Sequence, residues 1–259
     1  LRSRLEVRDL PGSHKNFPPL MDDIQKRISQ IEDEIRNTPY HKGTAHHIGK
    51  LRARLAKLKD SILETKPKKG GGRPFAIKKQ GDATVVLVGP PSVGKSTLLN
   101  RLTRAKSKVA VYTFTTVTVI PGMMKYRGAH LQVLDIPGLI EGASRGRGRG
   151  REVLSVVRGA DLLLLMAAVG QEDEFGRMQS ELHLNGVRIN EDPPKVKVAK
   201  TTRGGIHIIS PTKQELDLTT IAEVAKEFRV TNADINIGEK LTMERLIDAF
   251  AKNRVWLPA

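Results

Sequence analysis

Residues 89 to 96 read GPPSVGKS and match the pattern G-x-x-x-x-G-K-[ST] at every fixed position. The two glycines let a short loop curl, so that backbone N–H groups point inward at phosphate oxygens. Lys95 supplies a positive charge for the β- and γ-phosphates of a nucleotide, and the hydroxyl of Ser96 can ligate Mg²⁺. The pattern predicts a nucleotide phosphate site made of Gly89, Pro90, Pro91, Ser92, Val93, Gly94, Lys95, Ser96 and Thr97.

The segments on either side of this loop support the prediction. Thr84 to Val88 is a short apolar run rich in β-branched residues, which is typical of a strand buried on both faces. Ser96 to Leu102 has a helical pattern, and the positive end of such a helix would face the same anion. A strand before the loop and a helix after it are the context in which the pattern binds phosphate.

A second group of candidate residues follows another predicted strand, at residues 131–134. It consists of Asp135, Ile136, Pro137 and Gly138. An aspartate there can hold a Mg²⁺-bound water, and the glycine N–H can contact the γ-phosphate. Loss of that contact after hydrolysis would release the following segment, as in nucleotide-dependent switches.

A threonine-rich stretch lies between these two groups. One of its hydroxyls could complete the coordination of Mg²⁺, but such a stretch is equally typical of an ordinary strand. The residues alone leave both interpretations open. The candidates are Phe114, Thr115, Thr116, Val117 and Thr118.

The composition is that of a folded protein, with 39% hydrophobic and 28% charged residues in 259. No apolar run approaches the ~20 residues that span a bilayer, so we expect no membrane segment. The absence of cysteine excludes disulfides and thiolate metal sites and is compatible with a cytoplasmic protein. His46 and His47 lack metal-ligand spacing and are expected at the surface.

The net charge of +16 is unevenly distributed along the chain. Residues 1–80 hold 19 basic against 9 acidic side chains, residues 81–170 hold 12 against 5, and the remainder 13 against 14. The positive electrostatic field of such a charge excess favours a polyanionic partner, and we expect RNA or the ribosome. A basic surface can also serve solubility alone. No motif that reads a DNA sequence is present.

The amino-terminal part predicts a helical hairpin. Apolar residues recur at helical spacing from Ile24 to Ile35 and again from Ile48 to Ile62, on either side of a turn. Its outer face could hold phosphate, although any exposed helix needs charge. The basic residues of that face are Lys50, Arg52, Arg54, Lys57 and Lys59.

The rest of the chain predicts an α/β fold, a P-loop NTPase G domain with a mostly parallel sheet and helices on both faces. A further strand is expected at 162–169. Beyond it, strands at 195–199 and 205–209 with a helix at 218–228 indicate a small α+β insert, and a later helix is expected at 242–251. The expected domains are a helical hairpin and linker (1–72), a G domain (73–171), the insert (172–236) and a return to the G domain (237–259).

The combination GPPSVGKST (89–97), YTFTTV (112–117), DIPGLIEGA (135–143) and RGRGREVLSVVRGAD (147–161) resembles the Obg superfamily of translation-factor GTPases. It is most similar to the DRG branch, the developmentally regulated GTP-binding proteins, in an archaeal-like version. The HKGT string (41–44) and the glycine-rich approach to the loop (70–83) match that branch, which also carries a small insert similar to a ribosomal-protein fold.

The resemblance implies a GTPase that cycles between GTP and GDP. It implies Ser96, Thr116 and Asp135 around Mg²⁺, with Thr115 as the second choice to Thr116. Lys95, Thr116 and Gly138 would be the catalytic residues. Leu139 stands where Ras-like proteins have a water-orienting glutamine, so intrinsic hydrolysis is expected to be slow and to be helped by K⁺, a protein effector or the ribosome.

Two features of the family are missing. No N-K-x-D string occurs, so guanine specificity is implied by the resemblance and not seen in the residues, and no carboxy-terminal TGS domain is present. We expect the sequence to be part of a longer protein.

Arginines are concentrated between residues 141 and 158, beside the predicted γ-phosphate sensor. They could fold onto RNA or a partner in the GTP state only, one of them could stabilise transition-state charge, or the segment could be a solvated loop. They are Arg145, Arg147, Arg149, Arg151 and Arg158.

Three functions are compatible with these patterns. The leading hypothesis is a GTPase switch acting in translation through the ribosome or RNA. The alternative is a nucleotide- or RNA-binding module with negligible intrinsic turnover, which Leu139 favours. A P-loop ATPase or kinase is the third, and the combination of FTT and DIPG argues against it.

Overall fold

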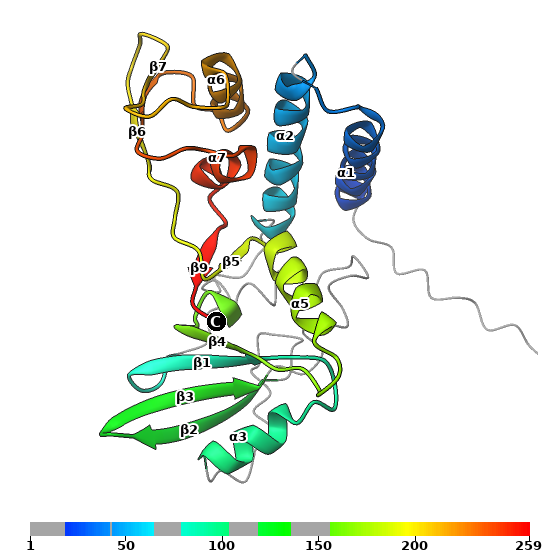
Figure 1. Cartoon of the computed structure of the whole chain (residues 1–259), viewed down its shortest axis with the longest axis vertical. Coiled ribbons are helices and arrows are strands. Elements are labelled where there is room, and N and C mark those ends of the chain that lie inside the picture. The colour runs from blue at the N-terminus through cyan, green and yellow to red at the C-terminus, as the bar shows by residue number, and fades with distance from the viewer. Residues whose placement is uncertain (1–18, 42, 65–78, 104–118, 136–155) are drawn as a thin grey trace, which may run out of the picture.

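The computed structural model describes residues 19–41, 43–64, 79–103, 119–135 and 156–259. Figure 1 shows these residues as two lobes. The lower lobe contains the sheet of strands β1 to β4 and the short helix α3 (Lys95–Thr103). The upper lobe contains two long amino-terminal helices beside a small α/β unit.

The sheet of the lower lobe has the strand order β2-β3-β1-β4. β1 (Ala83–Val88) pairs in parallel with β3 (Ala129–Asp135) on one side and β4 (Leu162–Leu165) on the other. β2 (Ile120–Tyr126) is antiparallel to β3. The predicted α/β class with a mostly parallel sheet is therefore confirmed.

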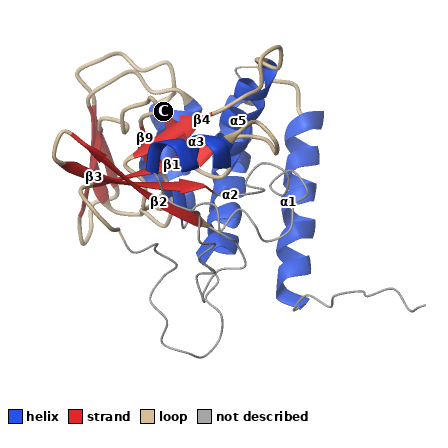
Figure 2. Cartoon of the chain, turned by 90° about the horizontal axis from the view of Figure 1, so that it is seen from below, coloured by secondary structure: helices blue, strands red, loops and turns tan. Residues whose placement is uncertain are grey.

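Both faces of this sheet carry buried side chains, because alternate residues of a strand point to opposite sides. Leu87 and Val133 pack against Leu99 of α3. Val86 and Leu134 point the other way, into a cluster that includes Met178 and Leu182 of helix α5 (Asp173–Leu184). Figure 2 views this sheet and α3 from below.

Two short parallel strands, β5 (Val187–Ile189) and β9 (Val255–Leu257), extend this architecture. The amide of Leu163 in β4 donates to the carbonyl of Pro258 at 3.0 Å, which places the end of β9 beside β4. The strand expected at 162–169 is shorter than predicted: β4 ends at Leu165, and Val169 is fully exposed.

The upper lobe has a core of its own. Its sheet has the order β6-β8-β7, with β6 (Val196–Lys200) antiparallel and β7 (Ile206–Ile209) parallel to the central β8 (Ala233–Ile237). Helices α6 (Leu218–Glu227) and α7 (Met243–Phe250) cover one face of this sheet through residues such as Ile221 and Leu246, both fully buried.

The domain limits of the sequence analysis remain predictions, and the buried clusters group the segments differently. α5 and β5, expected in the insert at 172–236, contribute Met178 and Val187 to the core of the lower lobe. α7, expected to belong to the G domain after residue 237, contributes Leu246 to the core of the upper lobe.

The predicted helical hairpin is present as α1 (Pro19–Asn37) and α2 (Ala45–Glu64). α2 packs against α6 and α7, and Ala53 is fully buried in their cluster. A Cβ on Gly49 would come within 2.5 Å of the Met243 methyl group, so the small residue permits this close approach. None of the described helices is long and apolar enough to cross a membrane.

The basic outer face expected on α2 is not a free phosphate-binding surface. Lys50 pairs with Glu223 at 3.4 Å, and Arg54 pairs with Glu227 at 2.9 Å, both on α6. Lys57 donates to the Glu227 carbonyl at 2.7 Å, and Lys59 pairs with Glu32 at 2.8 Å. Of the five residues, four therefore stabilise packing between helices, and only Arg52 lacks a contact of this kind within the described part of the chain.

Candidate nucleotide-phosphate site

The predicted phosphate loop connects the buried end of β1 to the start of α3. Its backbone reverses through two residues with positive φ, Ser92 (63°) and Gly94 (92°). Gly89 has a different requirement: a Cβ there would lie 2.5 Å from the carbonyl oxygen of Met166, the residue after β4. Gly89 therefore permits close packing of the loop on the sheet, and Gly94 permits the turn of the loop.

The side chain of Lys95 curls back over this loop. Its ammonium group donates to the carbonyl of Gly89 at 2.8 Å and to that of Pro90 at 2.7 Å, and the residue is only 7% exposed. The ammonium is thus held at the centre of the loop, where a phosphate can exchange for carbonyl oxygens as its partner.

Several backbone donors of the loop are available to a ligand. Within the described residues, no acceptor takes the N–H groups of Ser92, Val93 or Gly94, and the first N–H groups of α3 have no partner within the helix. The positive end of the α3 dipole adds to this field. Donors of this kind at the start of a helix are suited to phosphate oxygens.

The register of the sheet brings Asp135 to the same end. Leu87 of β1 is opposite Asp135 of β3, so the two parallel strands end side by side, next to the phosphate loop. The Ser96 hydroxyl, in the first turn of α3, donates to Asp135 Oδ2 at 2.6 Å. Two residues that are 39 positions apart in the sequence are therefore in direct contact.

The same pair fits a magnesium ion. Asp135 is 1% exposed, and its other oxygen, Oδ1, is buried without a hydrogen-bond partner among the described residues. Mg²⁺ prefers oxygen ligands and is bound by one or two protein oxygens together with nucleotide phosphates. Ser96 and Asp135 would hold the ion, and when bound it would neutralise charge on the phosphates.

The structure brings one part of the predicted site together. Residues 89–97 and Asp135 lie around one point at the carboxyl end of β1. The other predicted residues lie outside the described residues, so their place in the site stays a prediction. They are Phe114, Thr115, Thr116, Val117, Thr118, Ile136, Pro137, Gly138 and Leu139, together with Arg145, Arg147, Arg149 and Arg151.

Two side chains named in the sequence analysis make other contacts. Arg158, grouped there with the switch arginines, donates to Asn253 Oδ1 at 2.7 Å. His47 lies 2.9 Å from Glu34 on α1, and no group of metal ligands occurs among the residues that the structure describes.

Sequence reasoning missed a contact that fixes the start of β1. Asp161 pairs with Lys79 at 2.7 Å and accepts from the Thr84 amide at 2.8 Å. The hydrogen bond from Lys79, and then that from Thr84, hold the pKa of the Asp161 carboxyl below its usual value. An isolated aspartate before a strand gives no sequence signal for this role.

A buried charge network joining the two lobes was also missed. Arg188 of β5 makes a two-pronged contact with Asp248 of α7, at 2.6 and 2.8 Å. Arg254 donates to Asp248 at 2.6 Å and to Asp60 of α2 at 3.1 Å. All four side chains are at most 11% exposed, so the network ties β5 of the lower lobe to α7 and α2 of the upper lobe.

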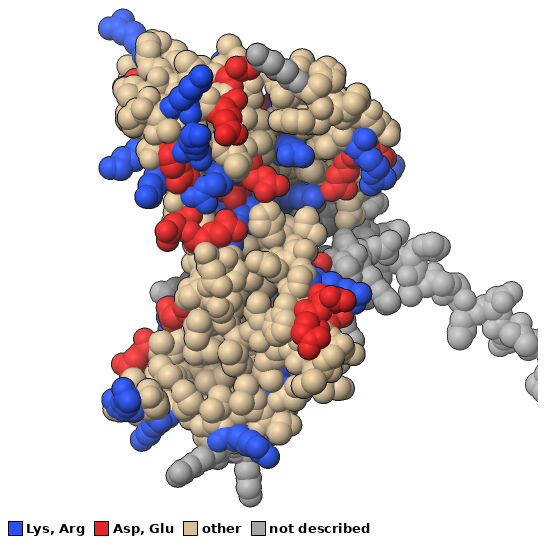
Figure 3. All heavy atoms as spheres, in the orientation of Figure 1, with Lys and Arg blue, Asp and Glu red and all other residues tan. Residues whose placement is uncertain are grey.

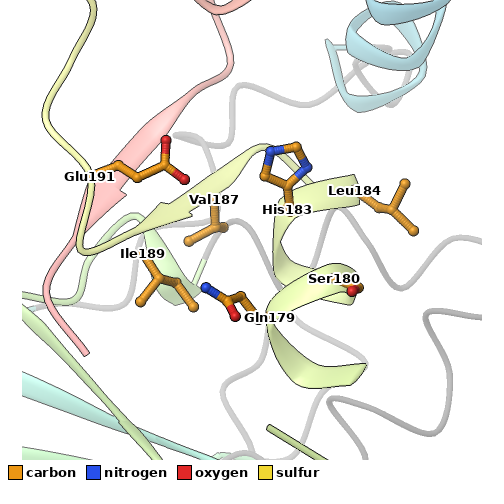
Figure 4. A pocket seen from close by; sticks show the side chains of 7 residues that line it. All are labelled: Gln179, Ser180, His183, Leu184, Val187, Ile189 and Glu191. Atoms are coloured by element: carbon orange, nitrogen blue, oxygen red, sulfur yellow. The ribbon is translucent and has the colours of Figure 1, made fainter. Parts of the chain in front are cut away.

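A separate hollow lies between α5 and β5 (Figure 4). None of the predicted phosphate-site residues contributes to it, so it is distinct from the loop at the end of β1. Its lining is Gln179, Ser180, His183, Leu184, Val187, Ile189 and Glu191.

The fold and the loop together define a P-loop GTPase domain. A sequence profile described as a 50S ribosome-binding GTPase matches residues 84–201, and a profile for the C-terminal region of that domain matches residues 203–259. The profiles thus begin with β1 and run to the end of the chain.

Within that class, the chain is similar to GTP-binding proteins of the DRG type. It is 48% identical over 237 residues to an uncharacterised GTP-binding protein of Methanocaldococcus jannaschii, covering 91% of this chain and 60% of the relative. It is 44% identical over 243 residues to developmentally-regulated G-protein 3 of Arabidopsis thaliana, covering 92% and 66%. The resemblance to DRG proteins is confirmed at this level.

A solved structure was also matched. The G domain of the T. maritima FeoB iron transporter is 27% identical, with a TM-score of 0.30, over 41% of this chain and 70% of that one. The chain spans about 60–66% of the length of the curated relatives named above.

Proposed function

We propose that the protein is a GTPase switch that hydrolyses GTP to GDP and phosphate with Mg²⁺ in the cytoplasm. The observation that carries the proposal is the contact of Ser96 with Asp135 at 2.6 Å, beside a phosphate loop closed by Lys95. This arrangement brings the Lys95 ammonium group, backbone N–H donors and oxygen ligands for a metal ion together at one point.

The proposed reaction is in-line attack of water on the γ-phosphorus, with GDP as the leaving group. Lys95 would stabilise the negative charge that builds up on the phosphate oxygens. The N–H groups of the loop would position the transferred group. Asp135 and Ser96 would hold Mg²⁺, with Thr116 as the third protein ligand and Gly138 donating to the γ-phosphate.

Slow intrinsic turnover follows from the residue after this glycine. The aliphatic side chain of Leu139 cannot hydrogen-bond the attacking water, so K⁺, a protein effector or the ribosome would accelerate the reaction. GTP would hold the segment after Asp135 in place, and hydrolysis would release it. We further propose a role in translation through binding of the ribosome or RNA, which the net charge of +16 favours.

Competition between GTP and ATP for the purified chain tests the nucleotide class. We expect GTP to displace a bound fluorescent guanine nucleotide better than ATP does. A clear preference for ATP would exclude the GTPase assignment and favour a P-loop ATPase.

Phosphate release separates the switch from the alternative, a nucleotide- or RNA-binding module with negligible turnover. Release is measured with and without ribosomes and K⁺, and in the Lys95→Ala variant. A switch predicts stimulated release that the variant loses, whereas a passive module predicts equal background under every condition.

A further inference from the structure

Five basic side chains of the insert lie in a segment that contains no acidic residue. Residues 193–214 contain four lysines and one arginine and no aspartate or glutamate. All five side chains are exposed, and within the described part of the chain none of them makes an ion pair or a hydrogen bond. We call this set the basic strip: Lys195, Lys197, Lys200, Arg203 and Lys213.

The basic strip differs in this respect from α2. Lys50, Arg54 and Lys59 of α2 are each paired with a glutamate, so most of their field is neutralised locally. The residues from 171 to the end are nearly neutral as a whole, with 13 basic against 14 acidic side chains. The strip is therefore a local excess of positive charge within a part of the chain whose net charge is close to zero.

The register of the sheet gives the strip its shape. Val196 and Val198 of β6 pack toward the core of the insert, so Lys195 and Lys197, at the alternating positions, lie on the opposite, outward face. From Lys195 to Lys200 the edge strand spans roughly 17 Å. None of the described helices of the insert covers this outward face, because α6 and α7 share the core cluster on the other side.

Basic residues also lie at both ends of the sheet. Lys200 and Arg203 are at the end where the chain passes from β6 to β7. Lys213 follows β7 at the other end, where the neighbouring Gln214 donates to the Glu239 carbonyl at 2.8 Å. In Figure 3, basic side chains project from the upper left of the molecule, over the β6 and β7 part of the insert.

The outward face has one acidic residue. Asp234, in the middle of β8, is half-buried and lies between Ala199 and His207 in the register. It makes no ion pair with the strip, and Lys200, in register with Ala233 of the core, is on the opposite face of β6 from Lys195 and Lys197. The face also carries no aromatic residue, since residues 193–214 contain no Phe, Tyr or Trp.

We propose that the basic strip binds the phosphate backbone of double-stranded RNA. This inference rests on the proposed RNA contact of the protein and assigns the surface and the form of RNA. Lysine and arginine side chains without acidic partners supply the charge that displaces counterions from a nucleic acid. Single-stranded RNA is generally held by bases stacked on aromatic side chains, which this face lacks, whereas helical RNA is read by shape and phosphate position.

Lysines on an edge strand also have a structural use, because they oppose pairing with the edge of another sheet. That role alone predicts no loss of RNA affinity when the strip is neutralised, and it predicts self-association of the variant. The two roles therefore give opposite results in one experiment.

The test uses the 259-residue chain and a variant with Lys195→Gln, Lys197→Gln, Lys200→Gln and Arg203→Gln. The matched control, Arg52→Gln, Arg101→Gln, Lys125→Gln and Lys252→Gln, removes the same charge from exposed residues elsewhere. Fluorescence anisotropy with a 20-base-pair RNA duplex and a 20-nucleotide single strand gives Kd at several salt concentrations. GTP affinity and circular dichroism show whether each variant is folded.

We expect the strip variant to weaken duplex binding about tenfold or more at 100 mM salt. The slope of log Kd against log salt should fall by about 1 for each phosphate that the variant no longer neutralises. The control should weaken binding much less, and the duplex should bind more tightly than the single strand.

Three results would overturn the inference. Equal losses of affinity in both variants would mean that only total charge matters, and an unchanged affinity of the strip variant would leave the edge-strand role alone. Tighter binding of the single strand would contradict the assignment of RNA form. In all three cases the proposed RNA contact survives, whereas absence of RNA binding by the unaltered chain would contradict both that contact and the strip.

Discussion

Ser96 Oγ donates a hydrogen bond of 2.6 Å to Asp135 Oδ2 and leaves Oδ1 of the same carboxylate buried without a partner among the described residues. A buried, half-satisfied carboxylate is costly in a folded protein unless a ligand completes its interactions. The Ser96–Asp135 pair therefore fits the proposed metal site between the end of β3 and the phosphate loop.

Removing either member of this pair should weaken magnesium-dependent nucleotide binding. We expect Ser96→Ala and Asp135→Asn to lower the affinity for GTP with Mg²⁺ by roughly 10- to 100-fold, because a contact to a charged group is worth about 1.5–3 kcal/mol. Without Mg²⁺ the loss should be much smaller. The measurement is GTP titration in Mg²⁺ and in EDTA, with Ser180→Ala on α5 as the control, and equal losses in both buffers would contradict the assignment.

The two glycines of the phosphate loop should respond differently to alanine. Gly89→Ala brings a Cβ to 2.5 Å from the Met166 carbonyl, and we expect a loss of about 1–3 kcal/mol of unfolding free energy as the loop shifts from β4. Gly94→Ala meets open space but keeps a positive φ, which costs about 1–2 kcal/mol.

Denaturant unfolding and GTP titration measure both effects. Gly176→Ala, inside α5 with no nearby atom, is the control and should stabilise the protein by about 0.5–1 kcal/mol. If Gly89→Ala left both stability and GTP affinity unchanged, the close packing of the loop on Met166 would not exist in solution.

The contact between the two lobes should depend on Asp248. Its removal in Asp248→Ala leaves the guanidinium groups of Arg188 and Arg254 buried without their shared carboxylate, and we expect a loss of about 3–5 kcal/mol. Glu223→Gln, at the more exposed pair with Lys50, should cost much less, because solvent screens an exposed ion pair. Similar small losses in urea unfolding for both variants would show that the network does not hold the lobes together.

The carboxylate of Asp161 should make the free energy of unfolding depend on pH in the acidic range. Lys79 and the Thr84 amide hold its folded pKa below the usual value, so its contribution is present near neutral pH and is lost as pH falls through that lowered pKa. Because the side chain is 43% exposed, we expect Asp161→Asn to lower the unfolding free energy by only about 0.5–1 kcal/mol at pH 7.

The wild type and Asp161→Asn should converge in stability as pH falls below the usual aspartate pKa of about 3.9 and through the lowered pKa of the folded protein. Urea unfolding at pH 7 and at pH 3 measures the difference. A constant gap between the two proteins at both values would mean that the ionised carboxylate is not what fixes the start of β1.

The phosphate loop, its strand and its helix could be predicted because each follows from a local pattern. β1 and α3 begin one residue earlier than expected, and α3 ends one residue later. β2, by contrast, has the sequence IPGMMKY, whose proline and glycine are poor in strands, and it is defined only by its pairing with β3. Local propensity cannot reveal an element that depends on its neighbour.

The long-range contacts could not be predicted from the sequence for a related reason. α2 has the basic face that a free phosphate-binding helix would have, and nothing near Lys50 or Arg54 identifies Glu223 and Glu227 as partners 173 residues away. The contact of Ser96 with Asp135 was predictable in part, because both residues belong to motifs that meet at the same edge of a parallel sheet.

Titration calorimetry of GTP with Mg²⁺ into the chain and into Lys95→Ala is the sharpest test of the proposed phosphate site. Lys95 is held at the centre of the loop by Gly89 and Pro90, and a phosphate would take over this ammonium as its partner. We expect stoichiometric binding by the chain, at least about 100-fold weaker binding by Lys95→Ala, and no change in Lys125→Ala. Equal affinity of the chain and Lys95→Ala, or no heat of binding in the unaltered chain, would contradict the proposed site.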